Sequence, residues 1–145
     1  MKLSVQIMLT AVFAFGVGLT SLTPSIAQGS ESVVLELNKL EPADKDCLLT
    51  FVVSSKSSKN LDKLAYEFVV FDDQLRVQRM TVFDFRELEA GKLRVRQFQL
   101  PQTQCSGLGR LLINDVSACD GNEVDASLCS SGLQISNKTN IEFLN

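Results

Sequence analysis

The residues of this chain that could carry chemistry are four cysteines, an acidic loop and a group of basic side chains, while histidine is absent. The cysteines are Cys47, Cys105, Cys119 and Cys129. A chain without histidine lacks the commonest general base and the commonest metal ligand. A serine or cysteine nucleophile would have no histidine to activate it. We therefore predict no catalytic residue, no metal and no cofactor, and expect a protein that is not an enzyme.

The first 27 residues have the layout of a secretory signal peptide. Lys2 gives a positive start, an apolar run extends from Ile7 to Leu19, and small residues lead to Ala27. This order of segments indicates cleavage after Ala27 and one mature domain at 28–145. An uncleaved anchor is the alternative, because residues 3–22 approach the ~20 residues that span a bilayer. We expect a periplasmic or secreted protein with no stable membrane insertion after cleavage.

The composition is that of one soluble globular domain. The chain is 45% hydrophobic and 21% charged, which distinguishes it from disordered and fibrous chains. Its net charge of −3 gives no overall attraction for nucleic acid or for an anionic membrane. We therefore predict no nucleic-acid partner.

The elements that must position the cysteines are short strands, and the sequence shows no long helical pattern. The clearest pair is 47–55 and 64–73, rich in β-branched and aromatic residues and joined by the polar stretch KSSKNLDK. The other candidates are 32–37, 75–85, 93–100, 105–116 and 133–144, the last with an interruption at Asn137. Within 75–85 the apolar phase shifts at Met80, which suggests a bulge. In 93–100 the alternation breaks near Arg96.

Seven strands with turns between them and no alternating helices predict an antiparallel immunoglobulin-like β-sandwich. A five-strand barrel is the structural alternative. The inner faces of the sandwich are expected to come from three strands and to consist of Leu49, Phe51, Val53, Tyr66, Phe68, Val70, Leu111 and Ile113.

The succession from CLLTFVVSSKSSKNLDKLAYEFVVFDDQLRV through LEAGKLRVRQFQLPQTQC to GRLLINDVSAC resembles a family of uncharacterised bacterial exported proteins. It is also similar in layout to FxLYD-type immunoglobulin-like domains, over roughly residues 46–119. The glycine expected after the aromatic-Asp turn is replaced here by Asp73 and Gln74. The resemblance implies the fold and brings no catalytic residues with it.

In an exported chain, four cysteines predict two disulfides, for which three pairings exist. In an immunoglobulin topology the second and sixth strands start at the same end of the sandwich, which favours Cys47 with Cys105. Cys119 and Cys129 would then close the loop before the last strand. The alternatives are Cys105 with Cys119, redox chemistry, and a zinc site, which the lack of a close CxxC pair disfavours.

Basic residues concentrate between Leu75 and Arg110, a segment that holds seven basic residues and three acidic ones. If the fourth and fifth strands present their basic side chains outward, an acidic protein or polysaccharide could bind there. The candidate binding residues are Arg76, Lys92, Arg94 and Arg96. The alternative is an ordinary water-facing side of a half-buried sheet.

The loop DGNEVD gathers oxygen ligands that suit calcium, namely Asp120, Asn122, Glu123 and Asp125. It lacks the spacing of a twelve-residue calcium loop and its terminal glutamate. A solvated turn beside a disulfide is the alternative.

The sequence leaves two classes of function. We favour an exported, non-enzymatic domain that binds a protein or a cell-envelope component through a sheet face or its loops. The alternative is a carboxylate-dependent hydrolase or an enzyme accessory subunit, which would need two carboxylates placed across a cleft. Ligand, partner and oligomeric state are not encoded in any motif of this sequence.

Overall fold

A computed structural model describes residues 30–145; the expected signal peptide at 1–27 lies outside the described residues. The described chain forms eight strands and two short 3-10 turns: β1 (Val33–Ala43), β2 (Asp46–Ser55), β3 (Leu61–Asp72), β4 (Val77–Leu88), β5 (Leu93–Leu100), η1 (Cys105–Gly107), β6 (Leu108–Asp120), η2 (Ala126–Leu128), β7 (Leu133–Asn137) and β8 (Glu142–Leu144). No helix among residues 30–145 has the length and apolar character needed to cross a membrane.

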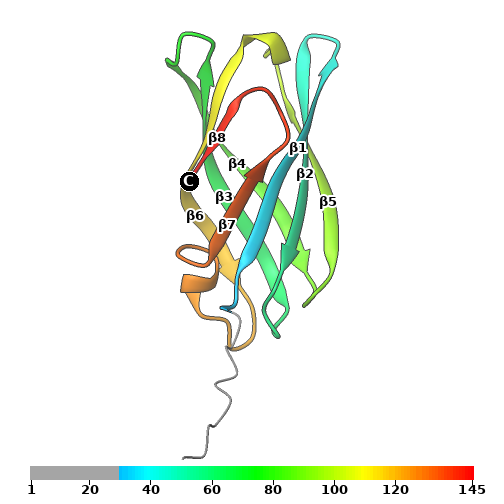
Figure 1. Ribbon diagram of the computed structural model, residues 1–145, viewed down its shortest axis with the longest axis vertical. Coiled ribbons are helices and arrows are strands. Elements are labelled where there is room, and N and C mark those ends of the chain that lie inside the picture. Colours follow the sequence, from blue (N-terminus) through cyan, green and yellow to red (C-terminus); the bar gives the residue numbers. More distant parts are fainter. Residues whose placement is uncertain (1–29) are drawn as a thin grey trace, which may run out of the picture.

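The strands form two stacked four-stranded sheets (Figure 1). Sheet A has the order β5-β2-β1-β7, and sheet B has the order β4-β3-β6-β8. Neighbouring strands are antiparallel except for the β1–β7 and β6–β8 pairs, which are parallel. The all-β, immunoglobulin-like sandwich predicted from the sequence is confirmed, with eight strands instead of about seven.

The core between the sheets is aromatic and centres on Phe51 of β2. Its ring lies 5.5–6.1 Å from five other phenylalanine rings, which come from both sheets: Phe68, Phe83, Phe85, Phe98 and Phe143. Every residue that the sequence placed on the inner faces of β2, β3 and β6 is buried. Alternation of apolar side chains therefore identified the inner side of these three strands correctly.

The first hairpin is longer than the sequence indicated. β1 runs on to Ala43, beyond the predicted end at 37, so only the two residues Asp44 and Lys45 separate it from β2. Pro42 is compatible with this because it pairs with Cys47 near the end of the ladder, where strands tolerate proline. Asp44 has φ 57°, the left-handed conformation that tight two-residue hairpins use.

The predicted last strand is divided between the two sheets. β7 pairs with β1 in sheet A, whereas β8 pairs with β6 in sheet B. The break falls at Asn137, as predicted, where the side-chain amide donates a 2.6 Å hydrogen bond to the carbonyl of Ile141. The Asn137 side-chain oxygen also accepts from the backbone N–H of Thr139, which closes the turn between the two strands.

The bulge predicted in β4 is present. Pairing with β3 shifts between Val77 and Arg79, so Gln78 is the extra residue. Because of this shift, Val77 and Met80 share the outer side of sheet B while Phe83 and Phe85 enter the core. β5, by contrast, pairs with β2 without any irregularity, so the break in apolar alternation near Arg96 is not a break in the backbone.

Candidate functional site

The structure joins all four cysteines in the pairing favoured from the sequence. Cys47 on β2 bonds to Cys105 of η1 at a sequence separation of 58, and Cys119 on β6 bonds to Cys129 after η2. The first bond connects sheet A to the start of β6, and the second closes the loop before β7. No free cysteine remains among residues 30–145, so within this range no thiol is left for redox chemistry or zinc binding.

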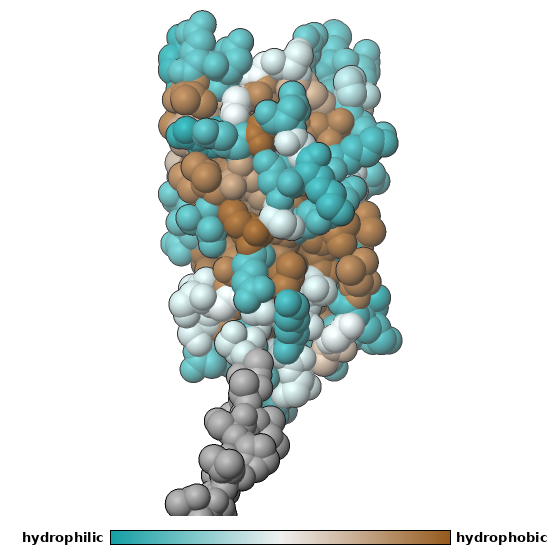
Figure 2. Space-filling model, viewed as in Figure 1, coloured by the Kyte–Doolittle hydropathy of each residue, from teal (hydrophilic) through white to brown (hydrophobic). Residues whose placement is uncertain are grey.

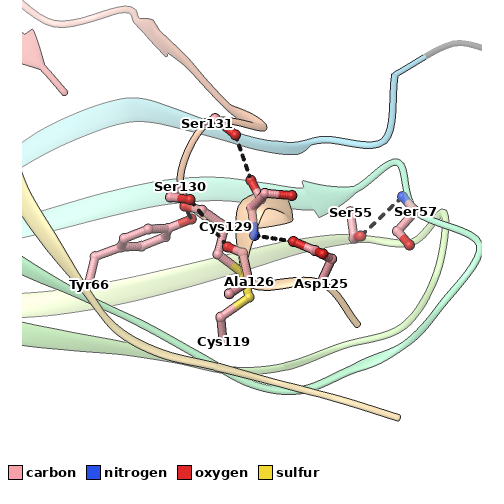
Figure 3. The surroundings of a disulfide bond; sticks show 10 residues. Ser55, Ser57, Tyr66, Cys119, Asp125, Ala126, Cys129, Ser130 and Ser131 are labelled. Atoms are coloured by element: carbon pink, nitrogen blue, oxygen red, sulfur yellow. Dashed lines mark hydrogen bonds between the residues drawn. A yellow bond between two sulfur atoms is a disulfide. The ribbon is translucent and has the colours of Figure 1, made fainter. Parts of the chain in front are cut away.

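The second disulfide lies against a buried tyrosine. The Tyr66 side chain extends from β3 toward the segment that carries Cys129, and its hydroxyl donates a 2.9 Å hydrogen bond to the Cys129 carbonyl (Figure 3). Burial raises the pKa of Tyr66 far above its usual value because the phenolate would lose its hydration. Because the Tyr66 phenol stays neutral near neutral pH and its proton is hydrogen-bonded to the Cys129 carbonyl, we interpret Tyr66 as a structural anchor.

The four predicted basic binding residues do not form one surface. Arg76 precedes β4 and Lys92 follows it, so the two lie at opposite ends of the sandwich (Figure 1). Each has a carboxylate partner: Arg76 pairs with Asp72 at 2.9 Å, and Lys92 pairs with Glu89 at 2.5 Å. The Lys92 ammonium, which donates a hydrogen bond, lowers the pKa of Glu89. The positive charges of Arg76 and Lys92 are therefore neutralised by carboxylates of the same chain.

Arg94 and Arg96 differ from the expectation that they point outward. They share the side of β5 that carries Phe98, toward sheet B, and their side chains are 31% and 20% exposed. Arg96 donates to the carbonyls of Phe85 and Glu87, which belong to the edge strand β4. The arginine thus covers the open side of the sandwich, where β4 and β5 are not paired by backbone hydrogen bonds.

The acidic loop does not assemble its four oxygen-bearing side chains into one site. Glu123, at φ 56°, forms a 2.6 Å ion pair with Lys59 of the β2–β3 loop. The Asp125 carboxylate caps η2 by accepting from the backbone N–H of Ser127. Within residues 30–145 no group of three or more cysteine or carboxylate side chains is placed to hold a metal ion.

A hollow of about 360 Å³ lies beside this loop and holds two carboxylates, as a carboxylate-dependent reaction would require. Serines line it together with Glu31 and Asp125. Glu31 accepts hydrogen bonds from the backbone and hydroxyl of Ser58, and the pKa values of both carboxyls are lowered by such bonds. A general acid needs a raised pKa. The two carboxyls of this hollow therefore lack the raised pKa that a general acid needs, and the hydrolase alternative stays a prediction.

An apolar row on the outer face of sheet B was missed by the sequence reasoning. Met80 pairs with Val69, Val69 with Leu112, and Leu112 with Leu144, so the row crosses all four strands on the side away from the core. Met80 is 55% exposed and Leu144 is 40% exposed, whereas Val69 is only 6% exposed and Leu112 is half-buried. We call these four residues the apolar row. Water-facing sheet surfaces normally carry polar residues at such positions.

The rows on either side extend this patch and give it a polar border. Val77 and Val82 lie beside Met80 on β4 and are 61% and 52% exposed. The remaining positions of these two rows, on β3, β6 and β8, are Phe71, Arg110, Glu142, Glu67 and Asp115. An apolar centre with a polar rim is the usual anatomy of a protein interface. We call the apolar row, its two flanking valines and this border the outer patch.

The outer face of sheet A carries a smaller apolar area. Leu93 and Val95 of β5 are 63% and 55% exposed, and Val95 pairs with the half-buried Val52 of β2. Figure 2 shows this side of the molecule, with hydrophobic atoms gathered where Figure 1 draws β2 and β5. This area stays on the two strands at one side of the sheet, whereas the apolar row spans sheet B completely.

Comparison with known proteins yields one distant structural similarity. No family model matches the chain, and no curated protein matches it significantly. A solved structure of the trimeric lipoprotein SadB of Salmonella enterica superposes with a TM-score of 0.45 at 17% identity, over 55% of this chain and 48% of that chain. The chain thus spans about half of that protein's length. The resemblance to FxLYD-type domains remains a prediction of the sequence.

Proposed function

We propose that this chain is an exported, non-enzymatic domain that binds a protein of the cell envelope through the outer patch of sheet B. The observation that carries the proposal is the apolar row Met80–Val69–Leu112–Leu144, which crosses the outer face of sheet B with Met80 and Leu144 exposed on the edge strands and Val69 and Leu112 set lower between them. Contiguous exposed apolar patches are rare on monomeric soluble proteins and commonly mark interaction sites.

Export is supported by the signal-like first 27 residues together with two disulfides, because disulfides persist in oxidising compartments. In such a compartment the two disulfides would stay formed. They would stabilise the fold against proteolysis, since each bond restricts the unfolded chain. A binding role for Arg76, Lys92, Arg94 and Arg96 stays a prediction; their separation and ion pairing make the outer patch the better supported surface.

Site-specific photo-crosslinking in the producing cell tests this proposal. A photoreactive amino acid replaces Val82 on the outer patch or, as a matched control, Val95 on sheet A; the two positions are 52% and 55% exposed. We expect a discrete crosslinked species from position 82 and none from position 95. Absence of any discrete species from position 82, in cells that export the protein, would show that the outer patch binds no protein.

A further inference from the structure

We propose that the partner of the outer patch is a second copy of this chain, bound face to face through a two-fold axis that runs along the apolar row. This inference rests on the proposed function, because it identifies the protein that the patch binds. A two-fold dimer needs a patch that is complementary to itself. The arrangement of rows on sheet B meets that requirement.

The apolar row can pair with itself. When two faces oppose each other, a two-fold axis lies in the plane between them, and an axis along the row places each row residue opposite its own copy. Met80 then meets Met80 of the second copy, and Leu112 meets Leu112. Aligned sheets cross at about 30°, which keeps rows close to the axis superposed. The most apolar part of the patch would therefore lose its water.

The two flanking rows exchange places across this axis. Val77 lies one row to one side of Met80 and Val82 one row to the other, so each valine would meet the other valine of the second copy. On β6, Arg110 and Asp115 lie on opposite sides of Leu112 in the same way. The Arg110 guanidinium, which pairs with Glu142 of its own chain at 2.5 Å, would thus also face Asp115 of the other copy, in two symmetric contacts. Of the charged border residues, Arg110 and Asp115 are matched in this way, whereas Glu67 would lie opposite Phe71.

Face packing is favoured over pairing of the β4 edges. Arg96 already donates to the Phe85 and Glu87 carbonyls of β4, and the Arg79 guanidinium donates to the Pro101 carbonyl beyond β5. Arginine side chains thus occupy the side of the sandwich where a second β4 strand would add. Edges protected by charged residues are the usual barrier to strand addition.

The size of the patch predicts a weak dimer. Four strands about 4.8 Å apart and about seven residues at about 3.3 Å each cover on the order of 450 Å². Stable complexes bury about 800 Å² on each partner, and smaller interfaces belong to transient associations. We therefore expect a monomer–dimer equilibrium that depends on concentration, with both species populated at micromolar levels or above.

Sedimentation velocity on the disulfide-bonded protein, purified from the export compartment, tests the inference. Loading from about 1 to about 500 μM covers the range expected for a weak interface. The decisive variants are Met80→Glu and Val95→Glu, because both side chains are 55% exposed on edge strands. Met80→Glu would bring two carboxylates together at the axis and weaken dimerisation at least about tenfold. Val95→Glu should leave the dissociation constant unchanged.

A second pair of variants probes the charged border. Asp115→Lys would place an ammonium opposite Arg110 of the second copy, so the dimer should weaken, and more strongly at low salt. Asp62→Lys makes the same charge change at an exposed position of β3 outside the outer patch and serves as the control. Circular dichroism melting of all four variants confirms that each is folded.

A parent protein that sediments as a monomer over the whole range would overturn the inference, as would equal dimerisation by Met80→Glu and the parent. Neither result would contradict the proposal that the outer patch binds a protein. The crosslink from position 82 separates the two: a species of twice the chain's mass indicates a second copy, whereas any other mass indicates a different protein and overturns only the dimer.

Discussion

The Tyr66 hydroxyl donates its hydrogen bond to the carbonyl of Cys129, a residue 63 positions later in the chain. The ring itself packs edge-on against Phe85 in the core, at 6.1 Å between centroids. One side chain thus connects the centre of sheet B to the disulfide that closes the loop before β7. Because the phenol is buried, its hydrogen bond lies in an environment where an unpaired carbonyl is costly.

Replacing Tyr66 by phenylalanine keeps the ring and removes only this hydrogen bond. We expect Tyr66→Phe to lower the free energy of unfolding by about 1–2 kcal/mol, because the Cys129 carbonyl stays buried without a donor. Urea denaturation measures the loss. Ser130→Ala removes a hydroxyl that bonds to the Ala126 carbonyl at an exposed site, so it should cost less than about 0.5 kcal/mol. Equal effects of the two variants would contradict the anchoring role of Tyr66.

The same variant should change the response to alkaline pH. The Tyr66 pKa is raised by burial above the 10.0 of an unfolded tyrosine, so its contribution is complete below pH 10 and declines as pH rises further. Tyr66 is the only tyrosine of the chain, which makes the comparison clean. We expect the stability gap between the parent and Tyr66→Phe to narrow above pH 10. A gap that is constant up to pH 11 would argue that the phenol is not buried in solution.

The central strands could be predicted from the sequence because burial fixes their pattern. Phe51 and Phe68 alternate with other residues that point away from the core, and this period of two is visible without a structure. The pairing of Cys47 with Cys105 followed from the same pattern, since strand order places the ends of β2 and β6 together. The inner faces and this disulfide could be predicted because their residues fill or bridge the core, as they would in any sandwich of this topology.

The outer surface could not be predicted in the same way. Val69 and Phe71 are as apolar as the core residues beside them. The sequence therefore does not show that they lie on the outer side of β3, next to the exposed residues of β4. The phase shift at Met80 predicted a bulge in this strand, but not that the bulge at Gln78 would bring Val77 and Met80 to the outer side. Arg96 was expected outside because of its charge, yet its long stem lies inward while its guanidinium reaches edge carbonyls.

The two disulfides should differ in their contribution to stability. Loop-closure entropy grows with the length of the closed chain, so the 58-residue separation of Cys47 and Cys105 corresponds to about 4 kcal/mol, and the 10-residue separation of Cys119 and Cys129 to about 3 kcal/mol. We expect Cys47→Ala with Cys105→Ala to lower the free energy of unfolding more than the other paired substitution does. Guanidinium denaturation of both double variants measures this order, and the reverse order would contradict it.

Gly109 is required where β6 passes close to the end of β3. A Cβ at this position would collide with the Asp72 carbonyl oxygen and lie 3.2 Å from the Asp73 Cα. Backbone atoms cannot move aside as a flexible side chain can, so Gly109→Ala should cost about 1–3 kcal/mol of unfolding free energy. Gly107→Ala is the matched control, because nothing lies within 4 Å of its Cβ. A thermal melt in which the two variants behave alike would be inconsistent with this packing.

Arg96 should not be replaceable by lysine. Its Nε and Nη2 atoms donate to two different carbonyls of β4, and a lysine ammonium cannot reproduce that planar fork. We expect Arg96→Lys to lower the free energy of unfolding by about 1 kcal/mol. Arg94→Lys serves as the control, because Arg94 contacts the Glu89 carboxylate, which an ammonium can also reach. Equal urea midpoints for both variants would show that the two hydrogen bonds from the Arg96 guanidinium do not add to the stability of the fold.

The turn between β3 and β4 depends on the charge of Asp72. Leu75 in this turn has φ 58°, a left-handed conformation that costs an L-residue about 1–2 kcal/mol. The Asp72 carboxylate compensates by accepting from the backbone N–H groups of Gln74 and Arg76, each at 2.9 Å. These bonds, led by the one from the Arg76 backbone, hold the pKa of Asp72 below the 3.8 of an unfolded aspartate.

A depressed pKa means that the stabilisation is complete above pH 3.8 and is lost as the pH falls through the lower folded value. Asp72→Asn should therefore melt at a lower temperature than the parent at pH 7, and the difference should shrink below pH 3.8 as the parent's carboxylate takes up its proton. Asp73→Asn, which changes the next carboxylate of the same exposed turn, is the control and should follow the parent at both pH values. Melting curves between pH 2.5 and 7 measure the difference, and one that stayed constant across this range would mean that the Asp72 charge does not hold the turn.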